Sequence, residues 1–143
     1  MQRAIRSIIE DQKPVTADAE ITVAAAARLM KERRVGAILV LEEGKLAGIF
    51  TERDAVFRVV AEGRDPAGTR IAEVMTANPR TITPDRPFGH ALHLMYEGGF
   101  RHVPVVDNGR PLGVVSSRDA LGPELKQFVA DLDTRTHIAE ILG

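Results

Sequence analysis

The residues best placed for chemistry occur in a short string that the chain contains twice. The first copy reads Gly-Ile-Phe-Thr-Glu-Arg-Asp-Ala over residues 48–55, and the second reads Gly-Val-Val-Ser-Ser-Arg-Asp-Ala over residues 113–120. An arginine at a helix amino terminus can bind phosphate, and a nearby carboxylate can accept hydrogen bonds from the vicinal hydroxyls of a ribose. Each copy therefore combines groups that are typical of a nucleotide site.

The same spacing also has a purely structural interpretation. Thr51-x-x-Asp54 and Ser116-x-x-Asp119 have the form of capping boxes, in which a hydroxyl and an acid satisfy free N–H groups of the first helical turn. Capping does not explain the arginines, which oppose the helix dipole, or the glycine that begins each copy. We expect the glycines to permit close backbone approach to a ligand, and we expect caps and ligand contacts to coincide.

The doubled string belongs to a longer internal repeat. At an offset of 65 residues, residues 14–55 align with residues 79–120 without a gap and share twelve identical positions. A repeat of this size indicates one supersecondary unit present twice, with two like halves facing each other across a pseudo-twofold axis. Functional sites are then expected where the halves meet.

Hydrophobic periodicity predicts the order β-α-β-β-α in each half. Apolar residues at helical spacing predict helices that begin near Val23 and Phe88, each preceded by an extended segment. Pairs of short apolar runs predict a hairpin in each half, and Asn108-Gly109 is typical of a tight hairpin turn. The predicted fold class is α+β (α/β). Three parts are assigned: repeat 1 at residues 1–64, repeat 2 at residues 65–128 and a C-terminal helical tail at residues 129–143.

Composition narrows the class of protein. The chain has 143 residues, 44% of them hydrophobic, which suits one globular unit, and it lacks cysteine for a disulfide or thiolate site. A formal net charge of -1 with mixed signs predicts no nucleic-acid partner and no anionic membrane surface. No apolar run, the amino terminus included, has the length of a membrane span. We expect a cytoplasmic location.

The chain contains no established enzymatic motif. It has neither a nucleophile elbow nor a phosphate-binding P-loop, and its four histidines form no recognised catalytic or metal pattern. His90 and His93 have a spacing that can bind a metal on a helix, but a solvated helix face is the commoner explanation. We expect a non-enzymatic protein that needs no metal and no cofactor.

Several motifs together resemble those of a tandem pair of cystathionine-β-synthase (CBS) domains, a Bateman module, over roughly residues 7–128. They are the two Arg-Asp-Ala strings, Ala-Glu-Val-Met-Thr at 72–76, Thr-Ile-Thr-Pro-Asp at 81–85 and Gly-Gly-Phe-Arg-His-Val-Pro-Val-Val-Asp at 98–107. The resemblance implies a pseudo-symmetric disc with two clefts. Such clefts bind adenosine-containing ligands, namely AMP, ADP, ATP, S-adenosylmethionine or NAD(H), with Mg²⁺ as a candidate accompanying ion.

The resemblance also implies roles for residues of both halves. Asp54 and Asp119 would accept ribose hydroxyls, one in each cleft. The remaining candidates are phosphate or ribose contacts at Thr51, Arg53, Ser116 and Arg118, opposite-half contacts at Thr16, Asp18, Thr81 and Thr83, and backbone contacts to the base at Ile38 and Val103. In this family the acid of one half works with the extended segment of the other, so Asp119 is paired with 16–18 and Asp54 with 81–83.

The two halves differ at two places that bear on a ligand. Arg101-His102 of the second half stands where the first half has Gly36-Ala37, so the phosphate-binding potential at that place is one-sided. Pro123 interrupts the helix that begins near Asp119, because its ring clashes with a carbonyl one turn back. Unequal clefts are therefore expected.

The predicted function is ligand sensing. A small nucleotide would bind between the repeats and change a surface that contacts a protein partner or a second copy in a homodimer. The alternative is a ligand-free adaptor on the same fold, and the two Arg-Asp pairs argue against it. Apolar residues after Pro123 at helical spacing predict a tail that packs on its own domain or on a dimer mate.

Overall fold

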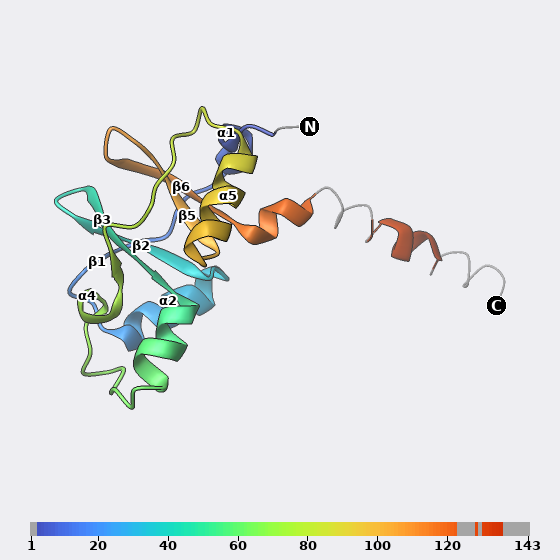
Figure 1. Cartoon of the computed structure of the whole chain (residues 1–143). Coiled ribbons are helices and arrows are strands. Elements are labelled where there is room, and N and C mark those ends of the chain that lie inside the picture. The colour runs from blue at the N-terminus through green and yellow to red at the C-terminus, as the bar shows by residue number, and fades with distance from the viewer. Residues whose placement is uncertain (1–2, 123–127, 129, 136–143) are drawn as a thin grey trace.

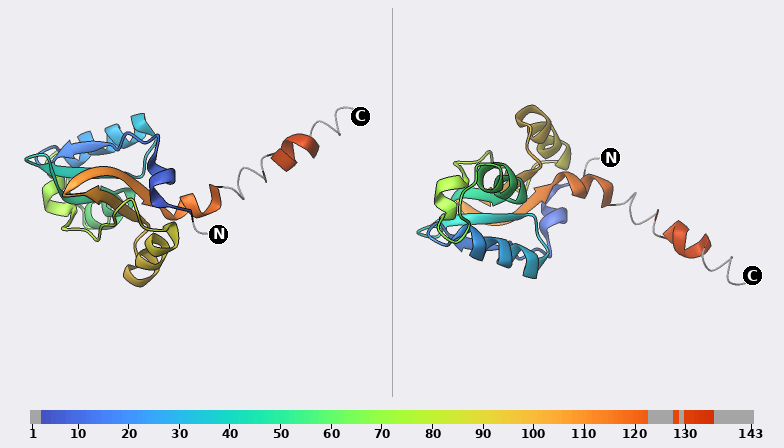
Figure 2. Two further views of the ribbon diagram at one scale, coloured as in Figure 1. Left: turned by 90° about the horizontal axis from the view of Figure 1, so that it is seen from above. Right: turned by 90° about the horizontal axis from the view of Figure 1, so that it is seen from below.

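The computed structural model describes residues 3–122, 128 and 130–135. Two units built around β-hairpins lie against each other, and helices cover the outer sides of the strands (Figure 1, Figure 2). The predicted fold class, two β-α-β-β-α repeats with a helical extension, is confirmed. Phe128 and residues 130–135 are helical, as expected for the tail.

The first unit contains a four-stranded sheet in the order β1-β2-β3-β4. Its strands are β1 (Thr16–Asp18), β2 (Ala37–Glu42), β3 (Lys45–Thr51) and β4 (Thr76–Ala77). β1 is parallel to β2, and the other neighbours are antiparallel. Helix α2 (Val23–Arg33) connects β1 to β2 and begins where the periodicity predicted.

The second unit repeats the helix and hairpin of this plan, but its sheet contains two strands in place of four. Helix α5 (Phe88–Gly98) precedes β5 (His102–Asp107) and β6 (Arg110–Ser116), which form the second hairpin. The expected extended segment is a single parallel bridge between Ile82 and Val105, 65 residues beyond the Ala17–Val40 pair of the first unit.

Both hairpins turn through residues with positive φ. Asn108 and Gly109 have φ values of 52° and 79°, and Glu43 and Gly44 have 51° and 76°. Two consecutive positive φ values match the right-handed twist of the flanking strands, which is why Asn-Gly is favoured. The hairpin prediction is confirmed in both halves.

Two short helices are exchanged between the units. Helix α1 (Ile5–Ile9) lies at the start of the first repeat, yet Ile5 and Ile9 belong to the apolar core of the second unit. Helix α4 (Ile71–Val74) lies at the start of the second repeat, and its buried residues belong to the core of the first unit. The packed units are thus interleaved, which the sequence boundary between residues 64 and 65 does not anticipate.

The exchange uses matching backbone hydrogen bonds in the two units. Ile5 N donates to the carbonyl of Arg86 at 3.0 Å, and Ile71 N donates to the carbonyl of Ile21 at 2.9 Å. Apolar side chains also fill the seam itself, where Leu39 and Ile49 pack with Val114 of the second hairpin. A separate apolar cluster therefore joins the two hairpins across the seam.

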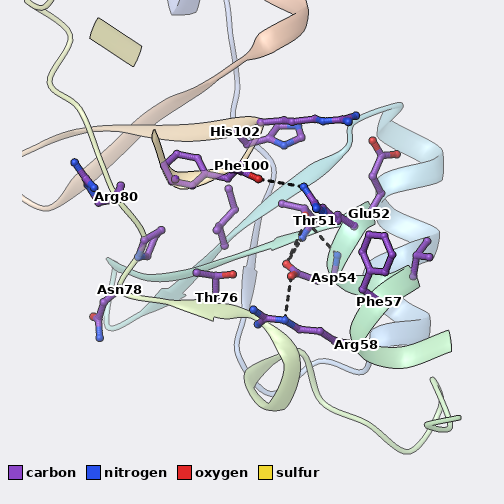
Figure 3. Close-up of a pocket in the computed structure, with 17 residues that line it drawn as sticks. Thr51, Glu52, Asp54, Phe57, Arg58, Thr76, Asn78, Arg80, Phe100 and His102 are labelled. Atoms are coloured by element: carbon purple, nitrogen blue, oxygen red, sulfur yellow. Dashed lines mark hydrogen bonds and ion pairs between the residues drawn. The ribbon is translucent and has the colours of Figure 1, made fainter. Parts of the chain in front are cut away.

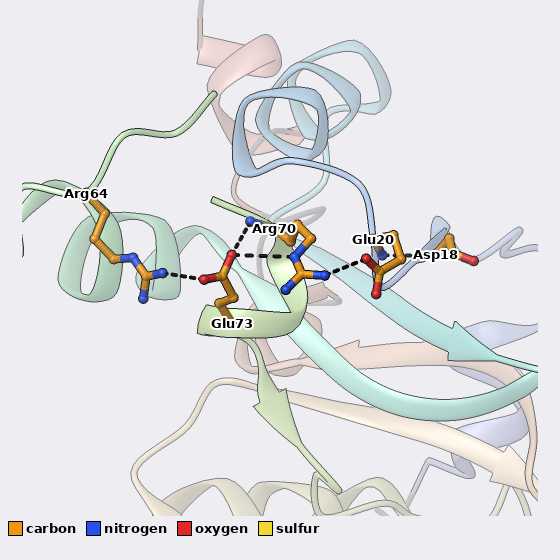
Figure 4. A network of polar contacts seen from close by, with 5 residues as sticks. All are labelled: Asp18, Glu20, Arg64, Arg70 and Glu73. Atoms are coloured by element: carbon orange, nitrogen blue, oxygen red, sulfur yellow. Dashed lines mark hydrogen bonds and ion pairs between the residues drawn. The ribbon is translucent and has the colours of Figure 1, made fainter. Parts of the chain in front are cut away.

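Ion pairs on the surface join α4 to the linker and to the segment before α2. Arg70 contacts Glu20 at 2.8 Å and Glu73 at 3.7 Å, and Arg64 contacts Glu73 at 2.8 Å (Figure 4). The hydrogen bond from the Arg70 backbone lowers the pKa of Glu73, and the Glu20 hydrogen bond raises the pKa of Arg70. All these side chains are solvent-exposed, so each pair stabilises the fold only weakly.

The hairpins lead into unlike helices. In the first unit, α3 (Glu52–Asp54) continues directly into a π-helix, η1 (Ala55–Val60), and Gly63 with φ 67° lies beyond its end. In the second unit the corresponding segment is a 3₁₀ helix, η2 (Ser117–Leu121). The predicted interruption at Pro123 lies outside the described residues and stays a prediction. Among the described residues, no helix has the length and apolar character to cross a membrane.

Candidate functional site

The acid of each doubled string caps the helix that follows it. In the first unit, Asp54 Oδ2 accepts from Thr51 N at 2.9 Å and from Thr51 Oγ1 at 3.2 Å, while Thr51 Oγ1 accepts from Asp54 N at 3.3 Å. In the second unit, Asp119 Oδ2 accepts from Ser116 N at 2.8 Å. The capping interpretation is therefore confirmed, and a ligand role has to coexist with it.

The glycine of each string makes room for protein rather than for a ligand. A Cβ on Gly48 would lie 2.5 Å from Met75 Sδ and 2.9 Å from the carbonyl oxygen of Thr76. A Cβ on Gly113 would lie 2.9 Å from the Ile9 side chain. These neighbours are the exchanged segments, so the expected close approach exists but serves packing of the two units.

A cavity of about 1030 Å³ lies beside Asp54 and is walled by both halves (Figure 3). One wall is the end of β3 with α3 and η1. The opposite wall is the segment between α5 and β5, and a third comes from the segment after β4. Its described lining residues are Ile49, Thr51, Glu52, Arg53, Asp54, Val56, Phe57, Arg58, Thr76, Asn78, Pro79, Arg80, Gly98, Gly99, Phe100, Arg101 and His102.

Cationic side chains outnumber anionic ones around this cavity. Four arginines line it, at positions 53, 58, 80 and 101, against two carboxylates, Glu52 and Asp54. The arginines come from both halves, so a bound anion would contact both units. Such a lining favours a negatively charged ligand.

Two of these arginines already have partners within the protein. Arg53 Nη1 donates to the carbonyl of Gly99 at 3.1 Å, and its guanidinium lies 5.4 Å from the centre of the Phe57 ring. Arg58 Nε lies 3.6 Å from Asp54 Oδ1. Arg53 therefore bridges the cavity between the halves, and Arg58 contacts the candidate ribose acid.

The cavity is also lined by a partly buried histidine and by two phenylalanines. Desolvation lowers the pKa of His102, against the opposing effect of the nearby Glu52 carboxylate. Burial therefore makes His102 harder to protonate than an exposed histidine. Phe57 is 57% exposed and Phe100 also lines the cavity, which gives a flat base two apolar surfaces to contact.

The structure brings together five of the residues proposed from the sequence, namely Thr51, Arg53, Asp54, Arg101 and His102. Thr81 and Thr83 are not among the described lining residues, and Asn78, Pro79 and Arg80 line that side instead. Thr83 Oγ1 donates to Asp85 Oδ1. The side chains of Ile38 and Val103 are fully buried in their strands, so a ligand contact there would use the backbone.

Sequence reasoning missed Arg58, Arg80, Phe57 and Phe100. Arg58 lies four residues after Asp54, a helical spacing that places both on one face and could have identified it. Arg80 directly precedes the proposed Thr81. The two phenylalanines carried no signal that distinguishes a cavity wall from a core position.

The surroundings of Asp119 are different. Arg3 Nη2 donates to the backbone carbonyl of Asp119 at 2.5 Å, and the guanidinium lies 5.1 Å from the Phe88 ring centre. Asp18 Oδ1 accepts from Glu20 N at 2.8 Å. Neither the large cavity nor a smaller one of about 350 Å³ beside the first hairpin includes Asp119 among its described lining residues. Ser116, Arg118 and Thr16 remain candidates for a second cleft.

The helix with two histidines offers no cluster of metal ligands. Nowhere in the described ranges do three or more histidine, aspartate or glutamate side chains gather as a metal site would require. His93 Nε2 lies 2.9 Å from Glu97 Oε1, and both side chains are exposed. This agrees with the interpretation of a solvated helix face.

Known proteins share this fold and sequence. The chain is 42% identical over 100 residues to the CBS domain-containing protein CBSCBSPB1 of Arabidopsis thaliana and covers 18% of that protein. It is 39% identical over 98 residues to the CBS domain-containing protein YhcV of Bacillus subtilis, with 68% of this chain and 69% of YhcV covered. The chain thus spans under a fifth of the Arabidopsis protein.

A solved structure shows the same arrangement with ligands. The CBS domain pair of protein MJ0100, in complex with 5'-methylthioadenosine and S-adenosyl-L-methionine, matches with a TM-score of 0.78 and 28% identity. The match covers 89% of this chain and 99% of that one. The family model for the CBS domain matches residues 5–61 and 71–122. This chain therefore belongs to the CBS domain family and contains two CBS domains.

Proposed function

We propose that this CBS pair is a non-enzymatic, cytoplasmic regulatory module that binds a phosphorylated adenosine ligand in the Asp54 cavity. The observation that carries the proposal is the convergence of Asp54, four arginines and two phenylalanines from both halves on one cavity. Adenosine offers a base for the aromatic surfaces and hydroxyls for the acid, and phosphate offers an anion for the arginines. The ligands of the MJ0100 pair support the adenosine part.

Charge narrows the ligand to AMP, ADP, ATP or NAD(H). S-Adenosylmethionine carries a sulfonium cation, which the four arginines of the cavity would repel. Nucleotides with more phosphates gain more charge-assisted hydrogen bonds, so we expect ATP and ADP to bind more tightly than AMP. Mg²⁺ would enter with the phosphates.

Regulation requires that the ligand changes the balance between arrangements of the two halves. A ligand shifts such an equilibrium only through its differential affinity for one arrangement. Arg53 already joins α3 to the Gly99 carbonyl across the cavity, so a phosphate there competes with a contact between the halves. Occupancy of the cavity is thereby linked to the position of α3 and η1.

The partner that we favour is a second copy of the chain. Large apolar side chains are exposed on the helices that follow the two hairpins, with Val60 73% exposed on η1 and Leu121 60% exposed on η2. Exposed large apolar side chains are candidates for an interaction surface, and a homodimer would cover them on both copies. Light scattering of Val60→Asp tests this: a wild-type dimer that becomes a monomer supports the surface, and an unchanged dimer removes it.

Calorimetry and thermal shift with AMP, ADP, ATP, S-adenosylmethionine and NADH test the ligand proposal. Asp54→Asn keeps an oxygen for capping but removes the charge, and it should weaken nucleotide binding about ten- to hundredfold. Asp107→Asn, on an exposed hairpin residue, is the matched control and should bind as the wild type does. If none of the five ligands binds, the ligand-free adaptor is favoured.

A further inference from the structure

Arg58 holds the candidate ribose acid from a second direction. Its Nε lies 3.6 Å from Asp54 Oδ1, while Thr51 occupies Oδ2 through its backbone N–H and its hydroxyl (Figure 3). Both oxygens of the Asp54 carboxylate therefore have protein partners. Asp54 is only 8% exposed, whereas the Arg58 side chain is half exposed, so solvent reaches this ion pair from the Arg58 side.

The guanidinium of Arg58 is itself anchored at its other end. Its Nη1 donates to the carbonyl oxygens of Val74 and Met75, both at 3.1 Å. These carbonyls belong to the end of the exchanged helix α4, which is packed in the core of the first unit. Arg58 thus connects Asp54 to a fixed part of the fold.

A carboxylate held in this way is suited to recognise a ribose. An ionised carboxylate has about four acceptor directions, so the contacts with Thr51 and Arg58 leave acceptor capacity free. Hydroxyl recognition depends on direction, and second contacts that fix a side chain rotamer preserve that direction. A carboxylate free to rotate would still attract cations but would discriminate less between a ribose and a deoxyribose.

We propose that Arg58 is a positioning residue that orients the Asp54 carboxylate toward the ribose hydroxyls and so sets ribose specificity in the Asp54 cavity. The inference rests on the proposed function and names a determinant of ligand choice within it. The second repeat has Pro123 at the position 65 residues beyond Arg58, which supplies no such donor to Asp119. Arg58 therefore acts in one half only.

The competing role for Arg58 is direct contact with phosphate, since it also lines the cavity. The two roles predict different measurements. Loss of a phosphate contact weakens the binding of ATP and of 2'-deoxy-ATP by the same factor, so the ratio of their dissociation constants stays unchanged. Loss of positioning lowers the ratio, because the ribose hydroxyl no longer meets an oriented acceptor.

The test is the ratio of the dissociation constants for 2'-deoxy-ATP and ATP, measured by calorimetry on the full chain. The wild type should prefer ATP by about tenfold or more, the value of a hydrogen bond to a charged group. Arg58→Gln should reduce this preference to about threefold or less. Arg58→Lys, which keeps a cation near Asp54, should retain a higher ratio than Arg58→Gln. Arg110→Gln, on the exposed second hairpin, is the control for lost charge and should keep the wild-type ratio.

The outcomes separate this inference from the function on which it rests. If the wild type prefers ATP and Arg58→Gln prefers it equally, the positioning role is overturned while the ligand proposal stands. If the wild type binds neither probe, the proposed function fails and the inference falls with it. A reduced ratio in Arg58→Gln with a normal ratio in Arg110→Gln supports both.

Discussion

The surroundings of Asp54 and Asp119 differ although the same string of residues carries both acids. Each acid accepts the backbone N–H of its hydroxyl residue and so caps a helix. Asp54 also meets Arg58 through its side chain and shares a large cavity with Arg101 and His102 of the other half. Asp119 instead has Arg3 on its backbone carbonyl. The string therefore specifies a structural turn, and residues outside it decide whether that turn also belongs to a ligand site.

Both halves have a glycine packed closely against an exchanged segment, and substitutions at these glycines should have the largest effect on stability. Gly48→Ala places a Cβ against the Thr76 carbonyl and Met75 Sδ, so overpacking should reduce the free energy of unfolding by about 1–3 kcal/mol. Gly113→Ala should act in the same direction through Ile9. Urea unfolding followed by circular dichroism measures both.

Gly68→Ala is the control for this prediction, because its new Cβ would approach only the Asp65 side chain, at 3.1 Å. Wild-type stability in Gly48→Ala would mean that the exchanged segment does not press on this strand. A loss confined to one of the two glycines would show that the halves are packed unequally at this point.

The difference between the two halves can be tested at Arg101, because the first repeat has Gly36 at the corresponding position. Arg101→Gln removes one of four arginines from the cavity and should weaken ATP binding about tenfold or more, the value of a charge-assisted contact. Calorimetry on this variant and on Arg110→Gln makes the comparison. Equal affinities in the two variants would remove Arg101 from the site.

His102 gives the Asp54 cavity a pH dependence. Burial lowers its pKa below the ordinary value of about 6.5, so His102 becomes protonated only as the pH falls below that value, and protonation adds a positive charge beside the ligand. Affinity for ATP should rise severalfold over this change, and His102→Gln should remove the rise. His93→Gln, on an exposed helix face, should keep it. An affinity that falls toward pH 5.5 in the wild type alone would contradict this role.

Protonation of His102 should lower the stability of the fold, although it should raise the affinity for ATP. A histidine whose folded-state pKa is lowered stabilises the fold fully above its unfolded value of about 6.5. That contribution is lost as the pH falls through the folded-state pKa. The thermal midpoint of the free protein should therefore decrease below pH 6.5, and less so in His102→Gln.

The smallest effect is expected at the surface ion pairs of the first unit. Arg70→Gln removes the contacts with Glu20 and Glu73, which are exposed and screened by salt. The thermal midpoint should decrease slightly at low ionic strength and match the wild type in 1 M salt. A large decrease that persists in 1 M salt would show that Arg70 acts through packing instead.

Local patterns in the sequence predicted much of the fold. Helical spacing identified α2 and α5, and apolar runs with Asn108-Gly109 identified the hairpins. The exchange of α1 and α4 was not predictable, because helices of five and four residues carry almost no periodic signal. Their partners are decided by packing across the two halves. The π-helix after Asp54 likewise has no sequence signature.

The candidate site was likewise predictable where local motifs contain its residues, and not where tertiary contacts place them. Asp54, Thr51 and Arg101 were found because local motifs contain them, and they do line the cavity. The wall formed by the segment after β4 was predicted at Thr81 and Thr83, but Asn78 to Arg80 line it. The path of a chain segment past a neighbouring unit depends on tertiary contacts, so sequence placed that wall only to within a few residues.

The most direct test of the account is calorimetric titration of ATP into the wild type, Asp54→Asn and Asp119→Asn. The claim that the two acids have unequal roles predicts strong binding at one site per chain, a loss of about ten- to hundredfold in Asp54→Asn and near-wild-type affinity in Asp119→Asn. Equal losses in both variants, or a loss in Asp119→Asn alone, would contradict it.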